Sequence, residues 1–125
     1  MYILTVEDSF SSAHQLRGYR GKCENIHGHN WKVVLSVQGE KLDDNGLLVD
    51  FHVLKSLLKQ ITAELDHKNL NEVPPFDKIN PSSENIARYI SEHTGRLLRG
   101  NAPVGITVHS VTVWESDTSR CTYIA

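Results

Sequence analysis

The chain lacks several features that mark specialised classes of protein. Its 125 residues include only 2 cysteines, too few for the dense disulfide framework of a small secreted domain. Lys and Arg total 13 against 15 for Asp and Glu, so the basic excess typical of nucleic-acid-binding domains is missing. No apolar run approaches the roughly 20 residues of a membrane span, and Glu7 follows the start too closely for a signal peptide. We therefore expect a cytoplasmic protein that binds neither nucleic acid nor a membrane.

What the chain does contain is typical of a globular protein. Apolar residues make up 39% and charged residues 22%, values that argue against wholesale disorder. This length suits one domain, so a single domain over residues 1–125 is expected. The unusual feature is the seven histidines, several of which lie at spacings that suit metal binding.

Strands are predicted near both ends of the chain, because apolar and polar side chains alternate there. In residues 27–39, Trp31 and Val33 begin one apolar face while Lys32 lies on the other. Residues 104–115 alternate in the same way, starting with Val104. The expected strands are 1–14, 27–39, 104–115 and 120–124.

Two amphipathic helices are predicted between these strands, over 51–65 and 83–98. Asp50 is the expected N-cap of the first, and Ser82 or Ser83 that of the second. Apolar residues form one face of each helix: Phe51, Leu54, Leu58, Ile61 and Leu65 in the first, and Ile86, Ile90 and Leu97 in the second.

The resulting order is β-β-α-α-β-β, which is typical of an α+β protein with an antiparallel sheet. Two helices cover only one face of such a sheet. The other face and the edge strands need cover, so we expect the chain to self-associate.

Three histidines have positions that suit a metal site. His27 and His29 share a face at the start of a predicted strand, because residues i and i+2 project to the same side. The short loop 15–26 would bring His14, at the end of the preceding strand, beside them. Three neutral imidazoles and one open position form a catalytic zinc site. A His-x-His pair that binds nothing stays open as the alternative, because short motifs also occur by chance.

Cys23 lies four residues before His27, and three roles are open to it. As a fourth zinc ligand it would close a structural site. As a nearby thiol with a lowered pKa it would be a catalytic base or nucleophile. As a buried side chain it would be inert. A disulfide to Cys121 is disfavoured in a reducing compartment.

Two further carboxylates have positions that suit catalysis. Asp66 precedes His67, and a neighbouring carboxylate raises the basicity of an imidazole and fixes its tautomer, as in a proton relay. Glu115 could accept two N–H groups of a flat heterocycle. Each also has an ordinary explanation, as a polar helix end or an exposed side chain. No chemistry is assigned to His52, His93, His109 or Cys121.

Together these motifs resemble those of the 6-pyruvoyl-tetrahydropterin synthase / 6-carboxy-tetrahydropterin synthase family over nearly the whole chain. Each motif alone is weak, but six in the same order and spacing are not expected by chance. They are residues 10–14, 23–30, 46–51, 65–71, 80–85 and 113–115, with Ser82 where Thr is more usual.

The resemblance implies the tunnelling fold, or T-fold, in which three subunits join their sheets into a barrel and two trimers stack as a hexamer. It places active sites at subunit interfaces. The residue roles that it implies are zinc ligation by His14, His27 and His29, proton transfer by Cys23 and an Asp66–His67 relay, and pterin anchoring by Glu115. Ser82 and Ser83 are candidate donors to the pterin, and Lys22 or Arg17 candidate contacts for phosphate.

The implied substrate is 7,8-dihydroneopterin triphosphate. Three residues separate Cys23 from His27, which is similar to the branch that forms 6-carboxy-5,6,7,8-tetrahydropterin, acetaldehyde and triphosphate for queuosine biosynthesis. The branch that forms 6-pyruvoyl-tetrahydropterin typically has a longer insert, and is the alternative. An aldolase-like branch has glutamate in place of the cysteine, which Cys23 argues against although Glu24 is adjacent. A non-catalytic protein with zinc closed by Cys23 is a more remote alternative.

Overall fold

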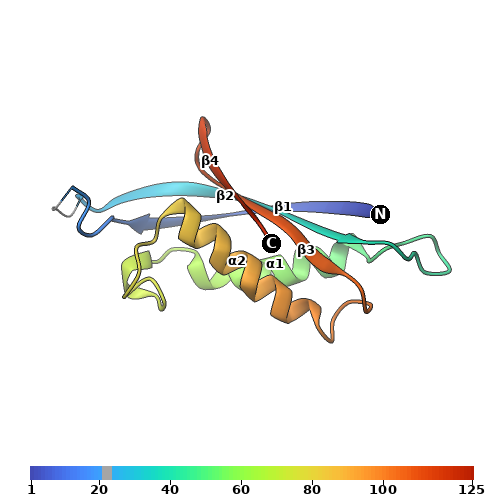
Figure 1. Ribbon diagram of the computed structural model, residues 1–125. Coiled ribbons are helices and arrows are strands. Elements are labelled where there is room, and N and C mark those ends of the chain that lie inside the picture. The colour runs from blue at the N-terminus through green and yellow to red at the C-terminus, as the bar shows by residue number, and fades with distance from the viewer. Residues whose placement is uncertain (21–23) are drawn as a thin grey trace.

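The computed structural model describes residues 1–20 and 24–125, and Lys22 and Cys23 lie outside these ranges. Four strands form one antiparallel sheet in the order β1-β2-β3-β4, and two helices lie on one side of it (Figure 1). The elements are β1 (Tyr2–His14), β2 (His27–Gly39), α1 (Phe51–Leu65), a short 3₁₀ helix η1 (Leu70–Glu72), α2 (Ser83–Leu98), β3 (Thr107–Ser116) and β4 (Ser119–Ile124). This order confirms the predicted α+β class and the β-β-α-α-β-β arrangement. Sequence patterns did not predict η1.

Each main helix begins where the sequence supplies an acceptor for the free N–H groups of its first turn. The carboxylate of Asp50 accepts from the amide of His52 at 2.8 Å, as predicted. The hydroxyl of Ser82 accepts from the amide of Asn85 at 3.2 Å, so Ser82 rather than Ser83 is the second N-cap. None of the helices in the described ranges is long and apolar enough to cross a membrane.

The core lies between the two helices and the sheet face that they cover (Figure 1). Phe10 and Trp31, which pair across β1 and β2, stack with ring centroids 5.9 Å apart. Leu58 of α1 and Ile90 of α2 are fully buried in this core. The alternation predicted for 27–39 is confirmed by its buried members, Trp31, Val33, Leu35 and Val37.

Two details of the predicted apolar pattern were wrong, and a third was incomplete. Phe51 is 54% exposed, because the buried face of α1 begins one turn later at Leu54. In α2 the predicted Leu97 packs against the core but is only partly buried, and the fully buried face also includes Leu98 and two small polar residues, Ser91 and Thr94, that an apolar pattern does not reveal. Val104 is fully exposed and precedes the strand, since Gly105 has a φ of +95° and belongs to the turn before β3.

The sheet face opposite the helices is largely polar. Pairs of hydroxyl and amide side chains bridge neighbouring strands across it: Thr5 with Ser36, Ser11 with Asn30, and Thr112 with Thr122. Within the described residues, β1 and β4 each have a sheet neighbour on one side only. An uncovered face and two edge strands agree with the expectation of self-association.

Truncating Leu58 should destabilise the fold far more than truncating Phe51. Leu58 has no exposed surface, so Leu58→Ala should lower the free energy of unfolding by about 2–5 kcal/mol through lost burial and a residual cavity. Phe51→Ala removes an exposed ring from the same helix and should change it by less than about 1 kcal/mol. Urea denaturation measures both, and equal losses would contradict this account of the core.

Candidate metal centre

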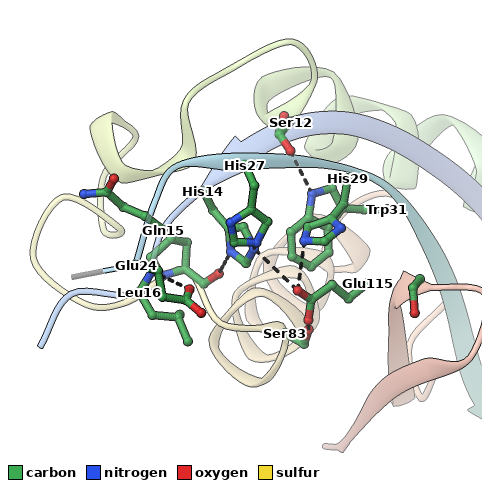
Figure 2. A network of polar contacts seen from close by, with 12 residues as sticks. Ser12, His14, Gln15, Leu16, Glu24, His27, His29, Trp31, Ser83 and Glu115 are labelled. Atoms are coloured by element: carbon green, nitrogen blue, oxygen red, sulfur yellow. Dashed lines mark hydrogen bonds and ion pairs between the residues drawn. The ribbon is translucent and has the colours of Figure 1, made fainter. Parts of the chain in front are cut away.

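The pairing of β1 with β2 brings three histidines together at one end of the sheet. His14 pairs directly with His27, and Ser12 with His29, so the three imidazoles share the helix-facing side (Figure 2). Their ring centroids lie 4.7–5.1 Å apart. His14 is 2% exposed, whereas His27 and His29 are half-buried. The predicted convergence of these residues is therefore present in the structure.

Glu115 completes the cluster from β3. Its Oε1 lies 2.9 Å from Nε2 of His29 and 3.6 Å from Nε2 of His14. The hydroxyl of Ser83, at the start of α2, donates to its Oε2 at 3.3 Å (Figure 2). The four candidate ligand atoms all lie within 4.8 Å of one another. The sequence had suggested Glu115 only as a partner for a heterocycle, so its place beside the imidazoles is new.

A local irregularity of β3 lies at Glu115. The register between β3 and β4 shifts between Trp114 and Ser116, and such bulges often re-aim a side chain near a functional site. The indole of Trp114 lies near two cations, with Arg120 4.6 Å and Lys32 5.9 Å from its ring centroid. These contacts hold Trp114 in place beside the carboxylate that faces the histidines.

Backbone carbonyls determine which ring nitrogens of the cluster carry protons. Nδ1 of His14 lies 2.7 Å from the carbonyl oxygen of Pro81, and Nδ1 of His27 lies 2.9 Å from that of Asn25. A carbonyl only accepts, so both Nδ1 atoms donate, and each neutral ring presents a lone pair at Nε2. These two Nε2 atoms are 3.1 Å apart. A cation between them would remove the repulsion, and metal-bound histidines generally donate their other N–H in this way.

The spacing and chemistry of the four groups fit a divalent metal ion. Two ligands 2.0–2.1 Å from a tetrahedral zinc lie about 3.3 Å apart, close to the 2.9, 3.1 and 3.6 Å separations found here. Nε2 of His29 is buried and makes no aligned hydrogen bond, although a Glu115 oxygen is 2.9 Å away. Burial lowers the pKa of His29, an effect that Glu115 only partly offsets, and the neutral imidazole is the metal-binding form.

The Asp66–His67 pair is present but separate from this cluster. Nδ1 of His67 lies 2.9 Å from Oδ2 of Asp66, and the other carboxylate oxygen accepts from the amide of Ser11 at 2.8 Å. The Ser11 amide and the His67 ring together hold the pKa of Asp66 below its usual value. The side chain of His67 is 83% exposed. Among the described residues, no hydrogen bond or ion pair joins Asp66 or His67 to the three histidines.

The remaining candidates have defined contacts where the structure describes them. Ser82 caps α2, and Ser83 contacts Glu115. Nη2 of Arg17 donates to the carbonyls of Phe76 and Ile79, which gives this candidate phosphate contact a structural use as well. Cys23 and Lys22 lie outside the described residues. The supporting carbonyls of Pro81 and Asn25 escaped sequence reasoning, since every residue has a carbonyl and no side chain signals its use.

Comparison with known proteins shows which family this chain resembles. The family model described as "PTPS: 6-pyruvoyl tetrahydropterin synthase" matches residues 3–125. The 6-carboxy-5,6,7,8-tetrahydropterin synthase of Synechocystis sp. is 35% identical, over 100% of this chain and 95% of its own. The human 6-pyruvoyl tetrahydrobiopterin synthase is 36% identical, over 92% of this chain and 86% of its own.

A solved structure agrees with these sequence matches. The 6-pyruvoyl tetrahydropterin synthase of Caenorhabditis elegans superposes with a TM-score of 0.80 at 30% identity, covering 100% of this chain and 97% of that one. The likeness extends over the whole β-β-α-α-β-β arrangement and confirms the expected T-fold. The chain belongs to the 6-pyruvoyl tetrahydropterin synthase family.

Proposed function

We propose that the protein is a zinc-dependent lyase that converts 7,8-dihydroneopterin triphosphate to 6-carboxy-5,6,7,8-tetrahydropterin, acetaldehyde and triphosphate, a step of queuosine biosynthesis. The observation that carries the proposal is the cluster of His14, His27, His29 and Glu115 in a chain of this pterin synthase family. The alternative is elimination of triphosphate from the same substrate to give 6-pyruvoyl-tetrahydropterin.

Zinc is the metal that the donor set favours. Imidazole nitrogens suit zinc, whereas magnesium and calcium take mainly oxygen ligands. In the proposal the three histidines hold the ion, which supplies Lewis-acid polarisation of a substrate oxygen when bound. Glu115, whose side chain is 34% exposed, remains reachable by a ligand and anchors the N–H edge of the pterin. Ser83 orients this carboxylate through its hydroxyl.

Cys23 is the proposed base that takes a proton from the substrate side chain. The contacts of its neighbour Glu24 support this role. The Glu24 amide donates to the carbonyl of Leu16 at 3.0 Å, and Leu16 lies two residues after His14. In return, the Leu16 amide donates to Oε1 of Glu24 at 3.1 Å. Both bonds join Glu24 to the segment that follows His14, and the second uses one of the two oxygens of its carboxylate.

The Asp66–His67 relay is proposed to act in a site shared between subunits. The pair is exposed and does not touch the cluster of its own chain in the described residues. A relay with this position suits a site that another copy of the chain completes. The edge strands β1 and β4 offer the means of association.

The choice between the two products depends on the sequence around Cys23. The two named relatives carry the two different product names at nearly equal identity, so overall likeness does not separate them. The three residues between Cys23 and His27 favour the carboxy-forming reaction.

Product analysis tests the proposed reaction. The zinc-loaded protein should convert 7,8-dihydroneopterin triphosphate to 6-carboxy-5,6,7,8-tetrahydropterin with one acetaldehyde per pterin, identified by chromatography and mass spectrometry. A pyruvoyl pterin without acetaldehyde would assign the alternative reaction. Absence of any pterin product would reject both.

Substitution of Cys23 should separate proton transfer from metal binding. Cys23→Ala should reduce turnover about 10²–10⁴-fold, the usual contribution of a positioned acid–base group, while bound zinc per subunit stays unchanged. His27→Ala should lose zinc and turnover together, because it removes a metal ligand. Loss of zinc from Cys23→Ala would instead identify Cys23 as a fourth ligand of a closed site.

The chain is expected to form trimers, or hexamers made from two trimers. Light scattering at micromolar concentration should report a mass three or six times the 14.1 kDa of one chain. A monomer that turns over substrate at that concentration would exclude a site shared between subunits.

A further inference from the structure

Two asparagine side chains pair with the backbone of the segment that follows His14. Asn71 accepts from the amide of Gln15 at 2.9 Å and donates to its carbonyl at 2.9 Å. Asn80 does the same with Arg17, accepting at 2.8 Å and donating at 3.0 Å. Each amide side chain therefore acts like a one-residue β-strand partner, using one donor and one acceptor.

Asn80 differs from Asn71 because it leads directly to the metal centre. The next residue is Pro81, whose buried carbonyl accepts from Nδ1 of His14 at 2.7 Å. Proline has no amide N–H to donate, so hydrogen bonds of its neighbours contribute to the orientation of its carbonyl. On one side the hydroxyl of Ser82 caps α2. On the other side lies Asn80.

Asn80 is itself held at several points. Its carbonyl accepts from Nδ2 of Asn85 at 2.9 Å, and its side chain is paired with the Arg17 backbone. The Arg17 guanidinium donates to the carbonyl of Ile79 at 2.8 Å, which fixes the residue before it. Arg17 lies only three residues after His14. Together these contacts hold the Pro81 carbonyl against the imidazole of His14, from whose Nδ1–H it accepts a hydrogen bond.

We infer that Asn80 is a positioning residue for the metal ligand His14. It fixes the Pro81 carbonyl, which keeps the proton of His14 on Nδ1 and directs the Nε2 lone pair towards the other ligands. The inference rests on the proposed metal centre and assigns no contact between Asn80 and metal or substrate.

Asn71 provides a matched control. It makes the same kind of amide pair, and to Gln15, which is closer to His14 along the chain than Arg17 is. Loss of either asparagine frees the segment by two hydrogen bonds. Only loss of Asn80 also releases the residue that precedes the carbonyl partner of His14.

The test measures zinc affinity by competition with a chromophoric chelator, using the full chain. Asn80→Ala should bind zinc about 10–100-fold more weakly than the unsubstituted protein, as is typical when a group that orients a ligand is lost. Asn71→Ala should stay within about threefold, because the carbonyl partners of the ligands are unchanged. With Co²⁺ in place of zinc, the visible absorption bands should change in Asn80→Ala alone.

Thermal unfolding of both variants separates positioning from general stability. Equal weakening of zinc binding in Asn71→Ala and Asn80→Ala, in line with lost stability, would overturn the inference, as would unchanged affinity in Asn80→Ala. If Asn80→Ala does not fold, Asn80→Asp keeps the acceptor but lacks the donor, and should also bind zinc more weakly; unchanged affinity there overturns the inference too. Failure of the unsubstituted protein to bind zinc would reject the metal centre itself.

Discussion

The antiparallel register between β1 and β2 is the constraint on which the functional site depends. The pairing runs without a shift from Tyr2 and Gly39 to His14 and His27. Because side chains alternate along a strand, a slip of one residue would move His27 to the opposite face of the sheet. The same slip would expose Trp31, which is fully buried and stacked on Phe10. Burial of the core thus enforces the geometry of the candidate ligands.

Burying the histidine cluster has a polar cost that a bound cation would relieve. His14 is almost fully buried, and a buried polar ring must be hydrogen-bonded or its burial destabilises the fold. The Pro81 carbonyl satisfies Nδ1, but it thereby leaves Nε2 as a lone pair facing that of His27. The contact that satisfies the buried ring at Nδ1 therefore also leaves its Nε2 able to bind a cation. Binding of a cation at this place should be coupled to stability.

Local sequence patterns predicted the bounds of the helices and strands better than the turn before β3 or the burial of individual residues. The bounds 27–39, 51–65 and 83–98 were correct because strand alternation, helical spacing and capping by Asp50 and Ser82 are all local. The strand predicted to start at Val104 starts at Thr107. Val104 and Ile106 suggested an alternating strand, but Gly105 between them has a positive φ and belongs to a turn. In α2 the apolar pattern found Ile90 and Leu97 but not Leu98, and the buried face between Ile90 and Leu98 includes Thr94, a polar residue.

The site was predictable to the extent that strand geometry determines it. Convergence of the three histidines followed from alternation and a short connection between paired strands. The resemblance pointed to Glu115, but its approach to His29 depends on the meeting of β3 with β2, which no local pattern specifies. The contacts of Asn80 depend likewise on how residues 66–82 pack against the end of β1.

The outer edge of strand β1 is covered near its end and open earlier in the strand. Near its end, residues 66–69 cover the outer edge: the amide of Ala13 donates to the Lys68 carbonyl and that of His67 to the Ser11 carbonyl. Earlier in the strand, residues 3–9 pair with β2 alone in the described part of the chain. Another strand could therefore add along this earlier part without displacing the segment that carries Asp66 and His67. The covered part of β1 lies beside Asp66, His67 and His14, and the open part lies earlier in the strand, so a second copy could pair with β1 without disturbing the candidate ligand His14.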